Sequence, residues 1–99
     1  MISVKIHRSY REVVAIADSE LIGKVFEEGN LQLDVKENFY KDEELNFEEA
    51  VELMINQKEE DATFNIIGKN SINAALEAGI ISEEGINEVQ GVPFALVLL

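Results

Sequence analysis

The sequence predicts one α+β domain spanning residues 1–99, in which a mixed β-sheet of about five or six short strands carries about three helices, mainly on one face. Three observations lead to this fold class. Several segments alternate apolar and polar residues, as strands do, and another repeats its apolar residues at helical spacing. The two kinds of segment follow one another without a strict strand–helix–strand rhythm, which disfavours a doubly wound parallel sheet. The length of 99 residues suits a single domain.

The N-terminal segment predicts a β-hairpin. Ile2–Ile6 alternates apolar and polar side chains, which is typical of a half-buried strand. The polar run 7–11 predicts a turn, and the largely apolar segment 12–17 predicts a second, more buried strand.

A short helix is predicted to follow this hairpin. Asp18 and Ser19 are suitable N-caps, and Gly29 would terminate the helix. Four apolar residues between them fall at helical spacing: Leu21, Ile22, Val25 and Phe26. Gly23 inside this segment costs up to about 1 kcal/mol relative to alanine, so a strand over 24–28 remains an alternative.

The segment 31–35 alternates leucine and valine with polar residues and predicts a further strand. The charged loop 36–45 that follows contains Phe39 and Tyr40. Because large aromatic side chains gain free energy on burial, we expect both to fold back against the sheet.

The helix after Asn46 has the clearest signal. Asn46 and Glu49 have the spacing of an N-terminal capping pair. Five apolar residues repeat along one helix face: Phe47, Ala50, Val51, Met54 and Ile55. The charged segment 57–61 would close the helix.

A strand and a helix are predicted next. The segment 62–68 is rich in β-branched and aromatic residues, which favours a strand. The segment 69–71 opens a helix that ends at Gly79, with Ile80 placed for a hydrophobic capping contact. Three residues of this helix would face inward: Ile72, Ala75 and Leu76.

The last part of the chain predicts a turn at 83–85, a short strand at 86–90, a tight turn at 91–93 and a buried final strand at 94–99. Glycines and one proline supply the turn residues. If the final strand were exposed, its edge would be open to pairing with another chain.

Acidic residues dominate the charge of the chain. Twenty acids and eight basic residues give a formal net charge of −12. Residues 34–61 contain eleven acids and three lysines, whereas residues 1–17 are slightly basic. This balance repels a polyphosphate backbone, so we expect no generic nucleic-acid binding. The acidic middle is either a solvated surface or a docking face for a basic protein partner.

The residues offer little for catalysis. Cysteine is absent and His7 is the single histidine, which excludes disulfides, thiolate nucleophiles and multi-histidine sites. No serine lies in a nucleophile elbow, and no acids have the spacing of an EF-hand. We therefore expect no catalytic residue, no metal and no cofactor. His7 is then an exposed residue at a strand end.

One anion-binding site is nevertheless a candidate. The segment 68–71 joins a predicted strand to a helix N-terminus, where amide groups and the helix dipole attract anions. Its members would be His7, Arg8, Lys24, Lys69, Asn70 and Ser71. They can meet only if the strand ends that precede Arg8 and Lys69 lie at the same edge of the sheet. Helix capping by Asn70 and Ser71 explains this segment without any ligand.

No apolar run approaches the roughly 20 residues that span a bilayer, and the N-terminus lacks the layout of a signal peptide. We expect a soluble, cytoplasmic protein with no membrane partner. The sequence leaves the oligomeric state open.

Six short motifs occur in an order that resembles a known family: His7–Ser9, Glu20–Lys24, Phe26–Gly29 leading into Leu31–Leu33, Asn65–Gly68, Ala74–Gly79 and Gly91–Pro93. In this order the sequence resembles domain of unknown function family 424, an uncharacterised and mainly archaeal family. The resemblance implies a cytoplasmic, single-domain archaeal protein with no established activity. It also implies an accessory role in translation, because such genes often lie near genes for translation and ribosome-related factors. Family members often have His-Ala-Gln after Gly-Val-Pro, where this chain has Phe94, Ala95 and Leu96.

We therefore expect a small acidic interaction or accessory protein that binds a basic partner, such as a translation or ribosome-related factor. The alternative is a small anion-binding enzyme that acts on a phosphate-bearing small molecule or an RNA end. That enzyme would use His7, Arg8, Lys24 and Lys69. Convergence of these four residues in a pocket would favour the enzyme, whereas scattered cations and an acidic face would favour the interaction protein.

Overall fold

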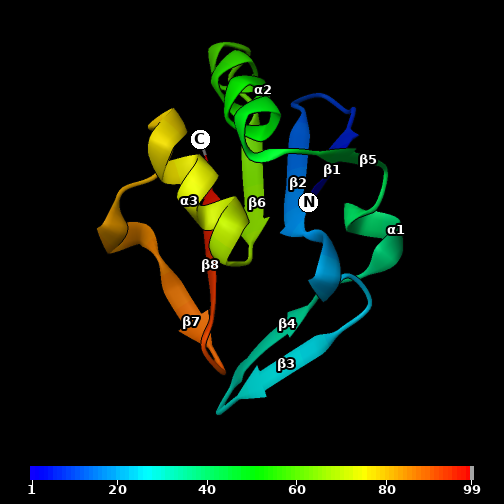
Figure 1. Ribbon diagram of the computed structural model, residues 1–99, viewed down its shortest axis with the longest axis vertical. Coiled ribbons are helices and arrows are strands. Elements are labelled where there is room, and N and C mark those ends of the chain that lie inside the picture. The colour runs from blue at the N-terminus through cyan, green and yellow to red at the C-terminus, as the bar shows by residue number, and fades with distance from the viewer. Residues whose placement is uncertain (99) are drawn as a thin grey trace.

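The computed structural model describes residues 1–98 and confirms the α+β class (Figure 1). The main sheet has six strands in the order β5-β1-β2-β6-β8-β7. Their bounds are β1 (Ile2–His7), β2 (Val13–Asp18), β5 (Glu43–Leu45), β6 (Thr63–Ile67), β7 (Asn87–Val89) and β8 (Val92–Val97). Neighbouring strands are antiparallel except β2 and β6, which run parallel, so the sheet is mixed as expected.

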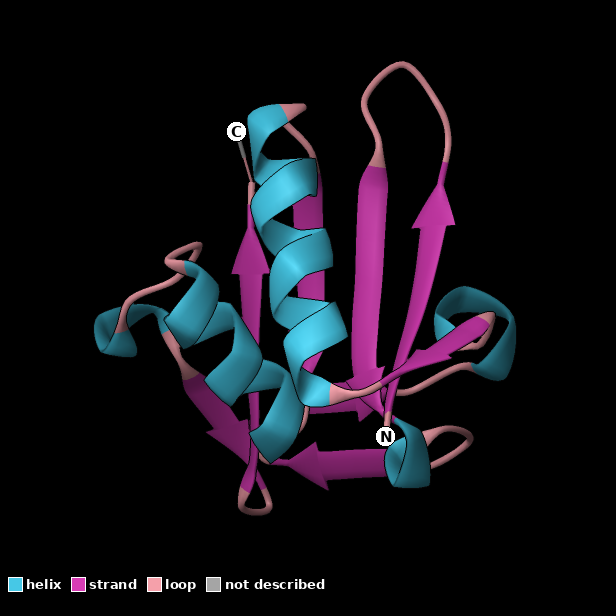
Figure 2. Ribbon diagram, turned by 45° about the horizontal axis from the view of Figure 1, so that its top comes forward, coloured by secondary structure: helices cyan, strands magenta, loops and turns pink. Residues whose placement is uncertain are grey.

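Two helices, α2 (Phe47–Glu59) and α3 (Lys69–Ala78), cover one face of this sheet (Figure 2). The main core lies between them and the strands. It includes Met54 from α2, Ile72 from α3, and Ile16, Phe64 and Ile66 from the two central strands, all less than 5 % exposed. None of the helices within residues 1–98 is long and apolar enough to cross a membrane.

The opposite face of the sheet is covered by a second, smaller layer. A separate hairpin of β3 (Val25–Glu28) and β4 (Leu31–Asp34) lies across one end of this face, beside the single-turn helix α1 (Glu37–Tyr40). Leu33, Val35 and Tyr40 are buried there against small residues of β2, and Phe39 packs on the same cluster. The expectation that both aromatic residues of this segment fold back on the sheet is confirmed.

The prediction of a helix between Asp18 and Gly29 is wrong. A short 3-10 turn, Ser19–Leu21, is followed after three residues by β3, in agreement with the alternative strand prediction over 24–28. Gly23 has a φ of +88°, and its N–H donates to the carbonyl of Val35, the residue that follows β4. Left-handed backbone at this point ends any helix, because consecutive helical residues need negative φ. Gly29 lies in the loop of the hairpin instead.

Two further elements differ from the sequence prediction. The segment expected to be a plain loop contains α1 and β5, which are too short to show a period. The tight turn is formed by Gln90 and Gly91, with φ of +52° and +78°. This pair of positive φ values is the geometry of a two-residue hairpin turn, so Pro93 already belongs to β8. Leu99 of the predicted final strand lies outside the described residues.

The predicted capping pair of α2 is confirmed. The Asn46 side chain accepts from the Glu49 N–H at 2.8 Å, and the Glu49 carboxylate accepts from the Asn46 N–H at 2.9 Å. The predicted apolar stripe is narrower than expected. Ala50 and Met54 are fully buried, whereas Ile55 is 43 % exposed.

Candidate functional site

The residues predicted to bind an anion lie at two different ends of the main sheet. β1 and β2 are antiparallel, with His7 opposite Val13, so Arg8 follows β1 at the end where β2 begins. β2 and β6 are parallel, so Lys69 follows β6 at the end where β2 finishes. The condition that both strand ends share one edge of the sheet is therefore not met, and the six residues do not form a single site.

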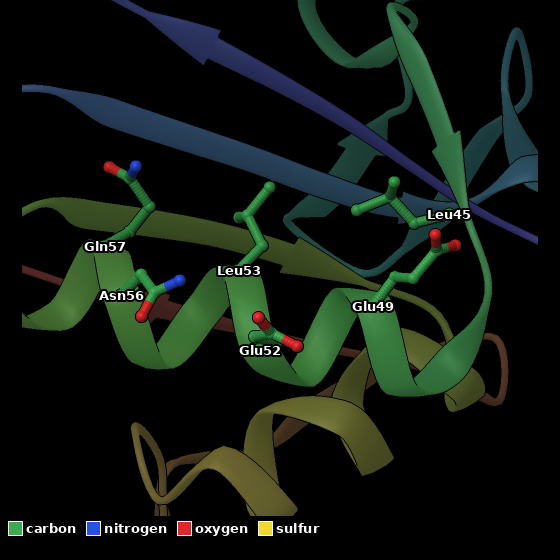
Figure 3. Close-up of a pocket in the computed structure, with 6 residues that line it drawn as sticks. All are labelled: Leu45, Glu49, Glu52, Leu53, Asn56 and Gln57. Atoms are coloured by element: carbon green, nitrogen blue, oxygen red, sulfur yellow. The ribbon is translucent and has the colours of Figure 1, made fainter.

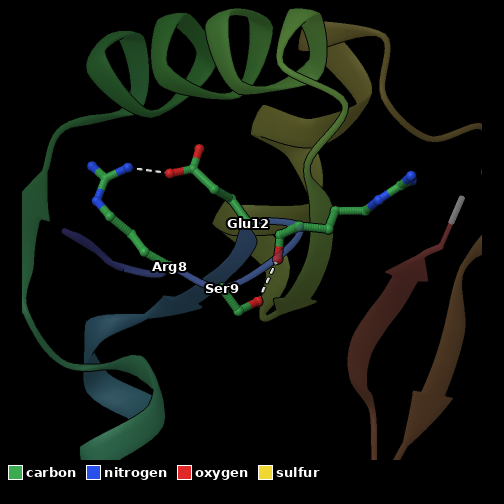
Figure 4. A network of polar contacts seen from close by, with 4 residues as sticks. Arg8, Ser9 and Glu12 are labelled. Carbon is green, nitrogen blue, oxygen red and sulfur yellow. Dashed lines mark hydrogen bonds and ion pairs between the residues drawn. The ribbon is translucent and has the colours of Figure 1, made fainter.

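Arg8 has a local partner in the turn between β1 and β2. Its guanidinium forms an ion pair with the Glu12 carboxylate, and the Ser9 hydroxyl donates to the Arg11 carbonyl at 2.7 Å (Figure 4). The Arg8 side chain is 73 % exposed, so this pair is screened by water and contributes little to stability. The network organises the turn between β1 and β2.

The N-terminus of α3 is already occupied by a carboxylate of this chain. Asp18, at the end of β2, is 4 % exposed. Its Oδ2 accepts from the Asn70 N–H at 3.1 Å, and its Oδ1 accepts from the Ser71 N–H at 2.8 Å. The Ser71 hydroxyl also donates to Oδ1, at 2.7 Å. The amides expected to hold an external anion therefore cap the helix through Asp18.

Gly68 makes this arrangement sterically possible. Its φ is +110°, and a Cβ at this position would overlap the Asp18 carboxyl group. The sequence suggested Asp18 only as a cap for the segment directly after it. Nothing local in the sequence pairs Asp18 with α3, because the contact depends on the parallel register of β2 and β6.

The other two predicted residues are isolated from each other. His7 is half-buried, stacks on Phe39 with ring centroids 4.4 Å apart, and places Nε2 2.8 Å from the Phe39 carbonyl oxygen. It is therefore more enclosed than the exposed strand-end residue that the sequence suggested. Lys24 is exposed between the 3-10 turn and β3. The four residues required by the enzyme alternative do not converge, because His7 and Arg8 lie at the opposite end of the sheet from Lys69.

Acidic side chains gather along α2 and β5 instead. A groove of about 470 Å³ runs beside α2, lined by Leu45, Glu49, Glu52, Leu53, Asn56 and Gln57. Figure 3 shows Leu53 and Gln57 on the side of α2 that faces the strands, with Leu45 at the β5 end of the groove. Leu45 and Leu53 both pack on the main core, so the groove combines an apolar floor with acidic walls.

The acids of this region have no basic partner in the part of the chain that the structure describes. Glu43, which shares the sheet face of Leu45 on β5, and Glu48 on α2 add two exposed carboxylates to this region. The ion pair found within residues 1–98 is Arg8 with Glu12, outside this region. Carboxylates without a basic partner generate a negative electrostatic potential, which attracts a positively charged ligand. No group of three or more potential metal ligands occurs in residues 1–98.

Gln57 adds an unusual feature to the groove. Its side-chain oxygen Oε1 is buried and accepts no hydrogen bond within the described residues. A buried acceptor without a partner costs free energy. Sequence reasoning missed Gln57, since it placed this residue in the loop that closes the helix.

Comparison with known proteins identifies the family. Residues 7–99 match the family described as "Protein of unknown function (DUF424)". The chain belongs to the DUF424 family. A search of curated proteins found no significant match to this sequence.

A solved structure shows the same fold as this DUF424 chain. It is described as an uncharacterized conserved protein from Methanopyrus kandleri, with a TM-score of 0.87. The similarity covers 97 % of this chain and 89 % of that chain, at 22 % sequence identity. At this identity the likeness concerns the fold. The α+β architecture of this DUF424 chain therefore recurs in an archaeal protein of low sequence identity.

Proposed function

We propose that this DUF424 chain is a non-enzymatic interaction protein whose α2 groove binds a basic segment of a protein partner. The observation that carries the proposal is the groove itself, where exposed Glu52 and its acidic neighbours flank the apolar side chains of Leu45 and Leu53. A lysine- or arginine-rich segment would place its aliphatic stems on the leucines and its charges near the carboxylates.

The partner class we propose is a basic translation or ribosome-related protein. The net charge of −12 favours fast, electrostatically steered association with such a partner. The scattered positions of Arg8, Lys24 and Lys69 support an interaction protein over an anion-binding enzyme.

Charge reversal in the groove tests this function. The variant Glu43→Lys/Glu52→Lys changes one exposed acid that lines the groove and one on the same sheet face as Leu45. The matched control Glu83→Lys/Glu84→Lys makes the same charge change in the turn before β7. Glu49 is left intact because it caps α2.

Each protein is used to capture partners from an archaeal extract, and the affinity of each captured protein is then measured at two salt concentrations. We expect the groove variant to lose a basic partner that the control retains, and we expect added salt to weaken the wild-type complex. Equal binding by the groove variant and the control would overturn the proposal, as would capture of acidic or uncharged partners alone.

A further inference from the structure

The sheet face opposite α2 and α3 contains two further hollows. The hairpin β3–β4 and α1 cover only part of this face, and the hollows lie where that cover stops. One, of about 270 Å³, lies between β4 and the strands β6 and β8. The other, of about 470 Å³, lies beside α1. Both are lined by Asp34 and Tyr40, so they adjoin at these two side chains.

Tyr40 supplies a polar group that the protein itself does not use. The residue is 6 % exposed and its ring packs edge-on against Phe39, with centroids 5.0 Å apart. The hydroxyl makes no hydrogen bond within residues 1–98, although its residue lines both hollows. Burial, and secondarily the nearby Asp34 carboxylate, raise the pKa of Tyr40 to about 12. Like any tyrosine hydroxyl, it is protonated at neutral pH and can donate to a ligand.

The smaller hollow combines apolar walls with an amide. Phe94 is half-buried and Leu96 is 58 % exposed, and both project from β8 on this face. Asn65, on the neighbouring strand β6, is half-buried, and its side-chain amide has no hydrogen bond within the described residues. Apolar surfaces next to a group that both donates and accepts suit a planar heteroaromatic base.

The larger hollow contains an ammonium group. Lys36 lines it together with the His7 ring, whose Nε2 is paired with the Phe39 carbonyl, and Lys5 lies at its margin, where its Nζ donates to the Asn38 carbonyl at 2.8 Å. Ammonium groups favour a phosphate or another compact anion. The carboxylate of Asp34 stands between the two hollows, where it can accept hydrogen bonds from sugar hydroxyls, as acidic residues do in dinucleotide sites.

We propose that the two hollows form one binding site for a free nucleoside monophosphate. The base contacts Phe94 and Leu96 and is hydrogen-bonded by Asn65. The sugar hydroxyls bind the Asp34 carboxylate and the Tyr40 hydroxyl, and the phosphate binds Lys36 beside the His7 ring. Together the hollows have a size typical of small-molecule sites. The net charge of −12 repels a polymer of many phosphates, so the ligand is a single nucleotide rather than a nucleic-acid strand.

The test is a series of titrations of the isotope-labelled protein followed by NMR. The probes are the four common nucleoside 5′-monophosphates, the matching nucleosides, inorganic phosphate and a short single-stranded oligonucleotide. We expect at least one monophosphate to shift the Asn65 side-chain amide and the His7 ring together. The matching nucleoside should shift Asn65 alone, and phosphate should shift His7 alone.

Single-residue variants test which side chains contact the nucleotide. Lys36→Ala should weaken monophosphate binding about tenfold, since it removes a charge-assisted contact. Lys41→Ala, an exposed lysine outside both hollows, should leave binding unchanged within about twofold. Tyr40→Phe keeps the buried ring and should weaken binding by several-fold. The proposal is overturned if no monophosphate shifts Asn65, if Lys36→Ala and Lys41→Ala behave alike, or if the oligonucleotide binds more tightly than every mononucleotide.

Discussion

The Oδ1 atom of Asp18 accepts two hydrogen bonds from Ser71, a residue 53 positions further along the chain, one from its N–H at 2.8 Å and one from its hydroxyl at 2.7 Å. Asp18 ends β2 and Ser71 lies in the first turn of α3. This contact fixes the helix to the centre of the sheet. It also neutralises the helix terminus that the sequence alone offered as an anion site.

Removing this carboxylate should destabilise the fold. Asp18→Ala leaves the N–H groups of Asn70 and Ser71 and the Ser71 hydroxyl without their acceptor, in a largely buried setting. We expect the free energy of unfolding to fall by about 2–3 kcal/mol, measured by urea denaturation. Glu20→Ala, at an exposed position in the following turn, is the control and should change it by less than about 0.5 kcal/mol. A variant at Asp18 as stable as this control would contradict the capping role.

The register of α2 can be checked by placing a charge on each side of the helix. Met54 is fully buried, whereas Ile55 is 43 % exposed. Met54→Asp should cost more than about 4 kcal/mol or prevent folding, because it buries an unpaired carboxylate. Ile55→Asp should cost less than about 1 kcal/mol, and half-buried Val51→Asp should lie between them. Thermal melts followed by circular dichroism give the order of stability of the three variants. Equal losses of stability on substitution of Met54 and Ile55 would show that the helix is rotated.

The raised pKa of Tyr40 predicts that the folded protein loses stability in alkali. The unfolded side chain loses its proton near pH 10, whereas folding raises the pKa to about 12, chiefly by burial. Between these two pH values the folded state binds more protons than the unfolded state. The free energy of unfolding therefore falls as the pH rises, by up to about 2–3 kcal/mol. Tyr40→Phe should lack this part of the decline. Urea denaturation of both proteins between pH 9 and about pH 12 measures the difference, and parallel curves would refute the assignment.

Binding to generic duplex DNA or RNA should be absent near physiological ionic strength. The net charge of −12 opposes the phosphate backbone, and the cations of Arg8 and Lys69 follow strands that end at opposite ends of the sheet. Fluorescence anisotropy with labelled duplexes is the measurement. Micromolar binding that weakens steeply with salt would reveal a basic surface able to overcome the overall charge.

Local signals in the sequence predicted most of the elements correctly. The Asn46–Glu49 capping box and the positions of Ala50 and Met54 on α2 follow from spacing within one helix. The strands β1, β2, β4 and β6 follow from alternation or from β-branched residues. The helix after Asp18 was mispredicted because Leu21, Ile22, Val25 and Phe26 match helical spacing by chance. The left-handed φ of Gly23 decides against it.

The sites depended on information that a local pattern does not contain. The separation of Arg8 from Lys69 follows from two strand directions, one antiparallel and one parallel, which periodicity leaves undetermined. The role of Asp18 as a cap for α3 is a long-range contact of the same origin. The acidity of residues 34–61 was visible in the sequence, but its concentration beside a groove with Leu45 and Leu53 required the packing of α2 on the sheet.

The parallel pairing of β2 and β6 also bears on how the chain folds. The hairpin β1–β2 and the unit β6–α3–β8 join residues that are near in sequence, whereas pairing Val13 with Thr63 closes the long loop that contains β3, β4, α1, β5 and α2. Closing such a loop costs entropy before any contact compensates for it, so this pairing should limit the rate of folding. Ile16→Val and Ile66→Val, in the paired central strands, should then slow refolding in stopped-flow measurements. Val92→Ala, in the local β7–β8 hairpin, should mainly accelerate unfolding. The two halves of the sheet would form separately, and their meeting at β2 and β6 would be the step that commits the molecule to its native state.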